Sequence, residues 1–459
     1  MRAMNLYGKL FQSLLFPVWE RGVRKRPTLL HREFLEKTQW RSIDELHAIQ
    51  SGSLRRLMRH AYTNVPLYRE KLQAVGLTDA DIRRPEDLRK MPVLTRDEAR
   101  SPPKDRESTA APFLAIRKNT GGTTGQPLLF GYDLESEYWR NAAKLRGYGW
   151  AGYNLGDRVL HFWGAPVERR PPLQKRAKIA LDRWVKRERY ISCGVMSDEV
   201  LERTARTIAA ERPTVLLCYT QAGAELARFI NKNALRDWDT VNVICGAERL
   251  FPHDRTALET AFGPAVYETY GCREVMLIAS ECEAHDGLHL TMENLIVELL
   301  VTERDGTTRQ AKEGERGDVV ITDLHNLGMP FIRYANGDAA IAGPSTRCSC
   351  GRTLPRLALV DGRTADTLHD AEGSAVNGLV FNIIFTALAN AVKQFQVVQH
   401  KDRSVTLRVV PGEGFNAAIL EETRRECGRF LKGVDVRIEK VDGIPLTAAG
   451  KHRVSIVET

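Results

Sequence analysis

The residues best suited to chemistry lie in a loop rich in glycine and threonine, Lys118 to Pro127. Three glycines and three threonines fill six consecutive positions, 120–125. Such a loop exposes backbone N–H groups and hydroxyls, which are the donors that phosphate oxygens require. It does not end in the Gly-Lys-Ser/Thr of a P-loop, so the usual phosphate lysine is missing. Because a loop of this composition is more often a simple turn, its assignment depends on other motifs.

Four further motifs follow this loop along the chain. They are residues 267–274 (YETYGCRE), 331–338 (FIRYANGD), 361–366 (DGRTAD) and 445–453 (PLTAAGKHR). The five together, in this order, resemble the adenylate-forming superfamily of acyl-CoA synthetases and adenylation domains. Residues 270–290 and 348–356 most resemble the phenylacetate–CoA ligase branch, which includes ligase-like proteins of capsule polysaccharide loci and coenzyme F390 synthetases.

The resemblance implies an ATP-dependent ligase that forms an acyl-adenylate from a carboxylic acid and releases pyrophosphate. The acid is already ionised at pH 7, so catalysis requires positioning and neutralisation of charge rather than a general base. The implied phosphate-binding residues of the loop are Thr120, Gly121, Gly122, Thr123, Thr124 and Gly125, with Thr124 also catalytic. The implied adenine pocket is formed by Gly246, Ala247 and Glu248 on one side and by Tyr270 and Gly271 on the other.

The remaining implied roles concern the metal, the ribose and the α-phosphate. Glu274 would bind Mg²⁺, and Asp338 would accept the ribose hydroxyls with help from Arg363. Lys451 would reach the α-phosphate and the substrate carboxylate, and its flexible cation suits a mobile lid. The hinge of that lid is expected between Gly362 and Leu368.

Two positions depart from the superfamily pattern, and the acyl acceptor stays open. Arg273 stands where most relatives have threonine, and Gln126 stands where many have lysine. The segment after Asp366 lacks the basic residues typical of a CoA-handling hinge, so the acceptor is either CoA or an amine. The identity of the acid and the oligomeric state also stay open, although relatives are often homodimers.

A second cluster of residues suggests a zinc site. Cys282, His289, Cys348 and Cys350 can supply four tetrahedral nitrogen and sulfur ligands, and some members of the resembled branch hold zinc with such residues. Four protein ligands leave no open position, so the metal would be structural. His285 competes with His289 for the fourth position.

The pattern of apolar residues predicts an α/β protein with a smaller, mobile α+β lid at the C-terminus. Residues 1–110 are expected to be the helical N-terminal part of the large domain. Residues 111–364, where strands alternate with helices, are expected to form the nucleotide- and acyl-binding core with mixed sheets, and residues 365–459 the lid.

Composition and charge favour a cytoplasmic enzyme. The 67 basic residues exceed the 58 acidic ones by nine, which suits nucleotide phosphates and does not by itself indicate nucleic-acid binding. Eight cysteines are too few for a disulfide framework. Residues 1–26 combine an apolar stripe with basic residues, which is typical of a helix docked on its own domain or of a membrane-surface helix. The alternative function is therefore a non-catalytic, membrane-peripheral scaffold that binds nucleotide.

Overall fold

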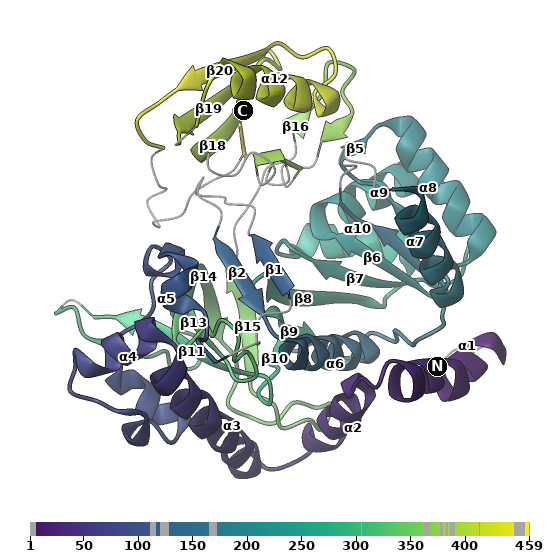
Figure 1. Ribbon diagram of the computed structural model, residues 1–459. Coiled ribbons are helices and arrows are strands. Elements are labelled where there is room, and N and C mark those ends of the chain that lie inside the picture. Colours follow the sequence, from purple (N-terminus) through teal and green to yellow (C-terminus); the bar gives the residue numbers. More distant parts are fainter. Residues whose placement is uncertain are drawn as a thin grey trace.

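A large body and a smaller C-terminal domain make up the computed structural model (Figure 1). It describes residues 6–110, 116–119, 128–164, 172–303, 305–361, 368–376, 380–381, 384–385, 391–412, 414–444 and 455–458. In that part of the chain, no helix has both the length and the apolar character needed to span a bilayer.

The N-terminal part is helical. Its elements are α1 (Leu6–Leu10), η1 (Phe11–Leu15), η2 (Val18–Val23), α2 (Thr28–Thr38), α3 (Ile43–Asn64), α4 (Pro66–Gln73), η3 (Asp79–Asp81), η4 (Pro85–Lys90), η5 (Glu98–Arg100) and α5 (Pro103–Arg106). A capping box between Ser42 and Glu45 starts α3. Pro66 ends α3 at the preceding residues and occupies the first position of α4, where its missing N–H costs nothing.

A twelve-stranded sheet runs through the large body in the order β12-β11-β13-β14-β15-β10-β9-β8-β7-β6-β3-β4. One half is parallel and is formed by β3 (Val159–Phe162), β4 (Glu188–Ile191), β6 (Val215–Tyr219), β7 (Asn242–Gly246) and β8 (Val266–Cys272). The direction changes at β9 (Met276–Glu281), which pairs antiparallel with β8. The remaining strands are β10 (Leu288–Leu290), β11 (Leu295–Thr302), β12 (Thr308–Gln310), β13 (Arg316–Asp323), β14 (Tyr334–Ala342) and β15 (Arg356–Asp361).

Helices cover the parallel half. They are α6 (Leu134–Trp150), α7 (Leu173–Lys186), α8 (Asp198–Glu211), α9 (Thr220–Lys232) and α10 (Pro252–Phe262). The largest buried apolar cluster lies between β3, β6 and β7 and the helices α8, α9 and α10. Two fully buried ion pairs, Arg140–Asp323 and Arg146–Glu293, fix α6 to the antiparallel half. A separate hairpin of β1 (Ile116–Asn119) and β2 (Leu129–Tyr132) leads into α6.

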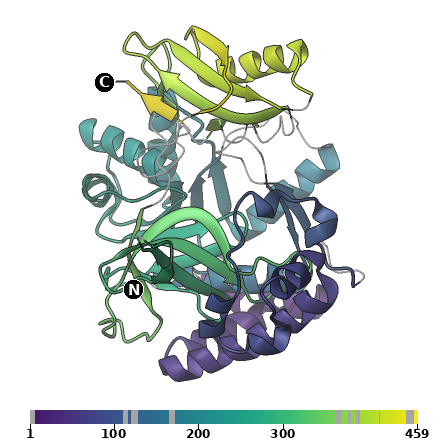
Figure 2. The same ribbon diagram turned by 90° about the vertical axis from the view of Figure 1, so that its left-hand side faces the viewer.

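The C-terminal domain lies above the large body in Figures 1 and 2. Its four-stranded sheet has the order β20-β19-β18-β21, formed by β18 (Val392–Gln399), β19 (Val405–Pro411), β20 (Val436–Lys440) and β21 (Ser455–Val457), with α12 (Ala417–Phe430) packed on it. A small sheet of β16 (Leu368–His369), β17 (Ala375–Val376) and β5 (Val195–Met196) joins this domain to the large body. In that sheet only β17 and β5 pair across the two domains, over two residues each.

Candidate active site

Tyr270, Asn336 and Asp338 form a hydrogen-bonded cluster between β8 and β14. The Tyr270 hydroxyl donates to Asp338 Oδ2 over 3.0 Å, and Asn336 Nδ2 donates both to Tyr270 Oη (2.9 Å) and to Asp338 Oδ2 (2.8 Å). Tyr270 and Asn336 are buried. Burial and the neighbouring Asp338 carboxylate raise the pKa of Tyr270 well above its usual value, so the phenol stays protonated and can keep donating. The cluster therefore fixes the orientation of the Asp338 carboxylate.

Glu274 lies close by, at the turn between β8 and β9. Its side chain is buried, and the Tyr334 hydroxyl donates to Glu274 Oε1 over 3.1 Å. Tyr334, Asn336 and Asp338 all belong to β14, and their hydrogen bonds direct them toward Glu274 and Tyr270, although the strand is irregular around Gly337, whose φ is 83°. The structure thus brings together two motifs that lie about sixty residues apart in the sequence.

A loop after β7 lies beside β8, because the Leu250 N–H donates to Glu268 Oε1 over 3.0 Å. Ala247 has a positive φ of 70°, and the Thr220 hydroxyl donates to Glu248 O over 2.8 Å. The Gln221 N–H donates to Glu248 Oε2, yet burial raises the pKa of this carboxyl to about 7. An added Cβ at Gly246 would come within 3.3 Å of the Trp163 ring, so a larger residue there would press on that indole. The backbone and side chains of β6, β7 and α9 therefore hold this loop in place.

Gly271 is required by the close approach of two strands. An added Cβ there would lie 2.1 Å from the Met276 carbonyl oxygen, across the β8–β9 pairing, which is irregular between Tyr270 and Gly271. The lack of a side chain lets β9 approach closely enough to place Glu274 beside Tyr334.

Several predicted residues lie outside the described part of the chain. They are Thr120, Gly121, Gly122, Thr123, Thr124, Gly125, Arg363 and Lys451. The start of the glycine–threonine segment is described, because Lys118 and Asn119 belong to β1. Burial lowers the pKa of Lys118, and the positive charges of Arg140 and Arg273 act in the same direction. Lys118 is therefore within electrostatic range of the 267–274 motif.

The four predicted metal ligands also lie together. The ligand atoms of Cys282, His289, Cys348 and Cys350 are all within 4.8 Å of one another. The two sulfurs of Cys282 and Cys348 are 3.8 Å apart, and Cys350 Sγ is 3.4 Å from His289 Nε2. His289 Nδ1 contacts the Leu354 carbonyl over 2.8 Å, which leaves Nε2 facing the sulfurs. His285 turns instead to Glu281, 3.0 Å away.

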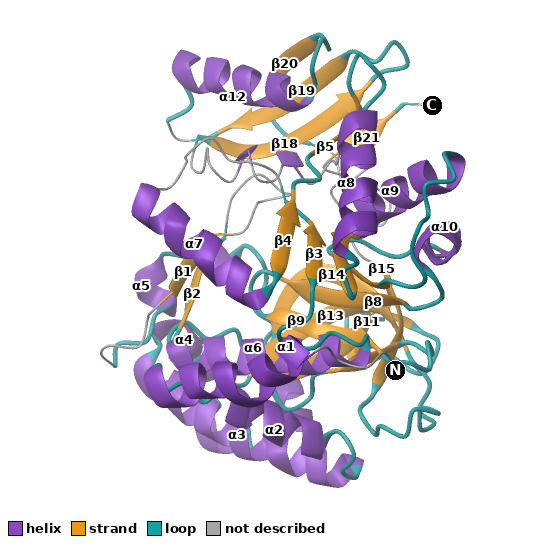
Figure 3. Cartoon of the chain, turned by 90° about the vertical axis from the view of Figure 1, so that its right-hand side faces the viewer, coloured by secondary structure: helices purple, strands orange, loops and turns teal. Residues whose placement is uncertain are grey.

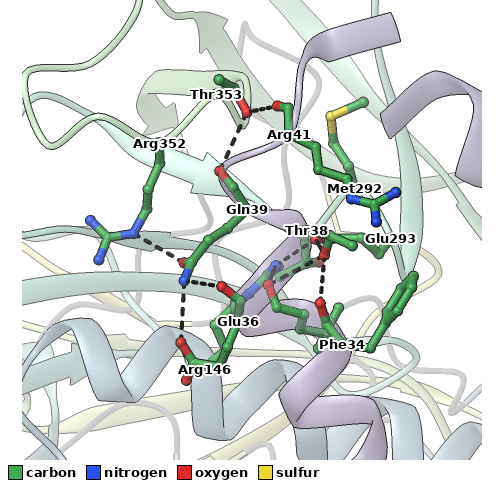
Figure 4. A network of polar contacts seen from close by, with 12 residues as sticks. Phe34, Glu36, Thr38, Gln39, Arg41, Arg146, Met292, Glu293, Arg352 and Thr353 are labelled. Atoms are coloured by element: carbon green, nitrogen blue, oxygen red, sulfur yellow. Dashed lines mark hydrogen bonds and ion pairs between the residues drawn. The ribbon is translucent and has the colours of Figure 1, made fainter. Parts of the chain in front are cut away.

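A polar network supports the loop that carries Cys350 (Figure 4). The Gln39 side-chain oxygen accepts from Arg352 Nε (3.1 Å) and from the Trp150 indole (3.0 Å). The Thr353 N–H donates to the Gln39 carbonyl over 3.2 Å. Arg352 N–H also lies 3.4 Å from Cys350 Sγ, which stabilises negative charge on that sulfur. The cluster is thereby linked to the end of α2 and to α6.

Sequence reasoning missed Asn336 and Tyr334 as supports of the site. Both stand within the 331–338 motif, close to Asp338, and this proximity is a signal that could have found them. The Thr220 hydroxyl binds carbonyl groups of a distant loop, which no local pattern reveals.

Comparisons with known proteins agree with this geometry. Residues 368–458 match the family described as the CapK C-terminal domain. The phenylacetate–coenzyme A ligase of Escherichia coli (strain K12) is 28% identical over 345 residues, which cover 73% of this chain and 75% of that enzyme. The ligase of the same name from Thermus thermophilus is 25% identical over 388 residues, covering 83% and 84%.

The fold also matches a solved ligase. A crystal structure of 2-hydroxyisobutyryl-CoA ligase, in complex with 2-HIB-AMP and CoA in the thioesterification state, superposes with a TM-score of 0.60 and 20% identity over 92% of each chain. At that identity the likeness concerns the fold alone, and it confirms the predicted α/β architecture with a smaller C-terminal domain. The chain is thus similar in sequence to phenylacetate–coenzyme A ligases over about three quarters or more of its length, its residues 368–458 match the CapK C-terminal domain, and its fold is that of an adenylate-forming CoA ligase.

Proposed function

We propose that the protein is an AMP-forming ligase that activates a carboxylic acid with ATP and then transfers the acyl group to CoA. The carboxylate oxygen attacks the α-phosphorus, the bond to pyrophosphate breaks, and the thiol later displaces AMP from the acyl carbon. The observation that carries the proposal is the buried contact of Tyr270 and Asn336 with Asp338, next to Glu274. The named curated relatives are CoA ligases, which supports CoA over an amine as the acceptor.

The proposed roles follow from the groups that the site offers. The Asp338 carboxylate accepts the ribose hydroxyls, and its orientation is held by Tyr270 and Asn336. Residues 246–248 form the opposite wall of the adenine pocket. Glu274, whose carboxylate is an oxygen ligand of the type that Mg²⁺ prefers, would hold the metal that neutralises the phosphates. The proposal also assigns roles to the glycine–threonine loop, Arg363 and Lys451, which lie outside the described residues.

The test is pyrophosphate exchange into ATP that depends on an added carboxylic acid. We expect exchange with at least one acid of a mixed aromatic and aliphatic panel, and a loss of at least about a hundredfold in Lys451→Ala and Asp338→Ala, because each removes a positioned charge. Lys401→Ala, at an exposed position of the C-terminal domain, is the control and retains exchange. Nucleotide binding without exchange for any acid would contradict the proposal and support a non-catalytic scaffold.

We also propose a structural zinc ion held by Cys282, His289, Cys348 and Cys350. Two sulfurs bound tetrahedrally at about 2.3 Å from zinc lie about 3.8 Å apart, and Cys282 and Cys348 have that separation. We expect one zinc per chain by elemental analysis, lost in Cys348→Ser together with thermal stability. Cys427→Ser, in the core of the other domain, would keep its zinc. A wild-type protein without zinc after purification in zinc-supplemented medium would refute the site.

Two further proposals concern the surroundings of the enzyme. All eight cysteines are unbridged, which supports a reducing compartment such as the cytoplasm. We also propose domain boundaries near residues 110 and 364, from the pattern of strands and helices along the sequence, and a homodimer, from the family resemblance.

A further inference from the structure

Helix α7 presents an apolar stripe to solvent. The structure buries none of its fourteen residues. Leu173 is 78% exposed and Trp184 is 76% exposed, and Leu181 is also exposed. Residues four, seven, eight or eleven apart share one face of a helix, so these three side chains form a continuous stripe with Ala177 and Ala180. A stripe of this kind on a globular protein normally lies against another surface.

The N-terminal helices present a second apolar surface. Their inner side packs on the large body through Phe11, which lies against Gly156. The outer side nevertheless exposes large apolar side chains, namely Leu6, Leu10, Leu14, Leu15, Val18, Trp19 and Val23. A helix that is apolar on both sides needs a partner for the side that its own domain does not cover.

These two surfaces lie on the same side of the molecule. The Tyr7 hydroxyl donates to the Val185 carbonyl over 2.6 Å, and the Arg187 guanidinium lies 5.1 Å from the centre of the Tyr7 ring. The C-terminal end of α7 therefore touches α1. Figures 1 and 3 both place α7 and α1 on the side of the molecule that Figure 3 turns toward the viewer.

Both segments that carry these apolar surfaces are rich in basic residues. Leu6–Arg26 contains five basic residues and one acidic residue, and Leu173–Arg187 contains six and one. Within the described part of the chain, Lys9, Arg24 and Lys25 of the first segment and Lys175, Arg176 and Lys178 of the second form no ion pair and are exposed. The partner of this face must therefore be both apolar and negatively charged.

We propose that this face docks the enzyme on an anionic lipid bilayer, with α7 and the segment Leu6–Val23 lying in the headgroup region. Apolar side chains, including two tryptophans, enter the interface while lysines and arginines contact lipid phosphates. A second copy of the chain fits less well, because a twofold contact would place like charges against each other. The proposal is independent of the ligase activity and does not rest on it.

The experiment is sedimentation of the full-length protein with vesicles of phosphatidylcholine, alone or mixed with phosphatidylglycerol. We expect binding only to the mixed vesicles, weakened by high salt. Lys175→Gln/Lys178→Gln should weaken partitioning by at least about tenfold, and Leu181→Gln/Trp184→Gln should weaken it through lost apolar contact. Quenching of tryptophan fluorescence by brominated lipid should fall in Trp19→Phe/Trp184→Phe.

The controls are substitutions of the same types at exposed positions away from α7 and the segment Leu6–Val23. Arg203→Gln/Lys401→Gln removes the same charge elsewhere, and Val75→Gln replaces an exposed apolar residue on the helical N-terminal part. Both should bind vesicles like the wild type. Equal binding by wild type and by the α7 variants, or no binding by the wild type, would overturn the proposal. If the wild type formed a dimer and bound no vesicles, and if the α7 variants were monomeric, this face would be assigned to self-association instead.

Discussion

At the scale of single residues, Asn336 is the central support of the cluster that it forms with Tyr270 and Asp338. Its amide donates to both Tyr270 and Asp338, and its own oxygen accepts the Asp338 N–H over 3.1 Å. Asn336 does not need to touch a ligand to act. It positions the carboxylate that is proposed to bind the ribose, so its effect belongs to nucleotide affinity rather than to the chemical step.

Asn336→Ala is predicted to raise the KM for ATP about tenfold while leaving kcat within about threefold. The substitution removes roughly one charge-assisted hydrogen bond from the Asp338 carboxylate, which is then held less firmly in place. Steady-state kinetics at varied ATP checks this split. The control Asn233→Ala changes an exposed amide on α9's C-terminal side and should leave both constants unchanged. A fall in kcat alone would contradict the positioning role.

Glu268 gives a prediction about stability and pH. Burial raises the pKa of this carboxyl to about 7, and the nearby Glu281 charge adds to the rise, against a bond from the Leu250 N–H. The folded protein thus keeps a proton that the unfolded chain releases near pH 4.5. The free energy of unfolding therefore falls as pH rises from about 4.5 to 7.

The glutamine of Glu268→Gln does not titrate. Between pH 4.5 and pH 8, the free energy of unfolding of this variant should therefore fall by about 2 kcal/mol less than that of the wild type. Urea unfolding at several pH values measures the difference. Glu248 has a pKa raised in the same way, but it is present in both proteins and cancels. Glu70→Gln, at an exposed position, is the control; parallel profiles for wild type and Glu268→Gln would show that Glu268 is ionised in the fold.

At the scale of the elements, the β8–β9 pairing depends on Gly271. Gly271→Ala is predicted to lower the free energy of unfolding by about 1–3 kcal/mol, because its Cβ would collide with a backbone carbonyl that cannot move aside alone. Chemical denaturation checks this. Gly149→Ala in α6 is the matched control, since no atom lies within 4 Å of its added Cβ, and helix propensity predicts no loss of stability. Equal stability of both variants would contradict the close approach.

The sequence predicted some elements well and missed others for a physical reason. Residues 295–302 and 316–323 carry enough apolar and β-branched residues to be recognised as strands, and the structure pairs them antiparallel. The two-residue strands β5 and β17 exist only through their tertiary pairing, so no local pattern indicates them. At the site, the family resemblance pointed to Tyr270, Glu274 and Asp338, but the hydrogen bonds between them and their neighbours follow only from the pairing of distant strands.

At the scale of the whole molecule, the order of the twelve strands was not predictable from the sequence. Alternating strands and helices indicated a parallel part, but the junction of β8 with β9, where the sheet changes direction, follows from contacts between motifs. The described link between the domains is small: β5 meets β17 over two residues each, and Val195 packs on the core of the C-terminal domain.

Val195→Asp is predicted to loosen the C-terminal domain without unfolding the large body, because it places a charge against that domain's apolar core. Limited proteolysis read by mass spectrometry should show faster cleavage between residues 361 and 391, while the main thermal transition stays within a few degrees. Val75→Asp, an exposed valine on the helical N-terminal part, is the control. Unchanged cleavage would mean that other contacts hold the domain.

The pairing of β1 with β2 has a consequence for how ATP is captured. Asn119 lies opposite Leu129, so the two ends of the nine-residue segment 120–128, which contains the glycine–threonine motif, are held next to each other. The free energy of bringing the two ends of this segment together is thus already spent when the protein folds. In the proposed site, a triphosphate bound by the intervening backbone amides would act on a segment whose two ends are already fixed, so less of its binding energy would be needed to close that segment.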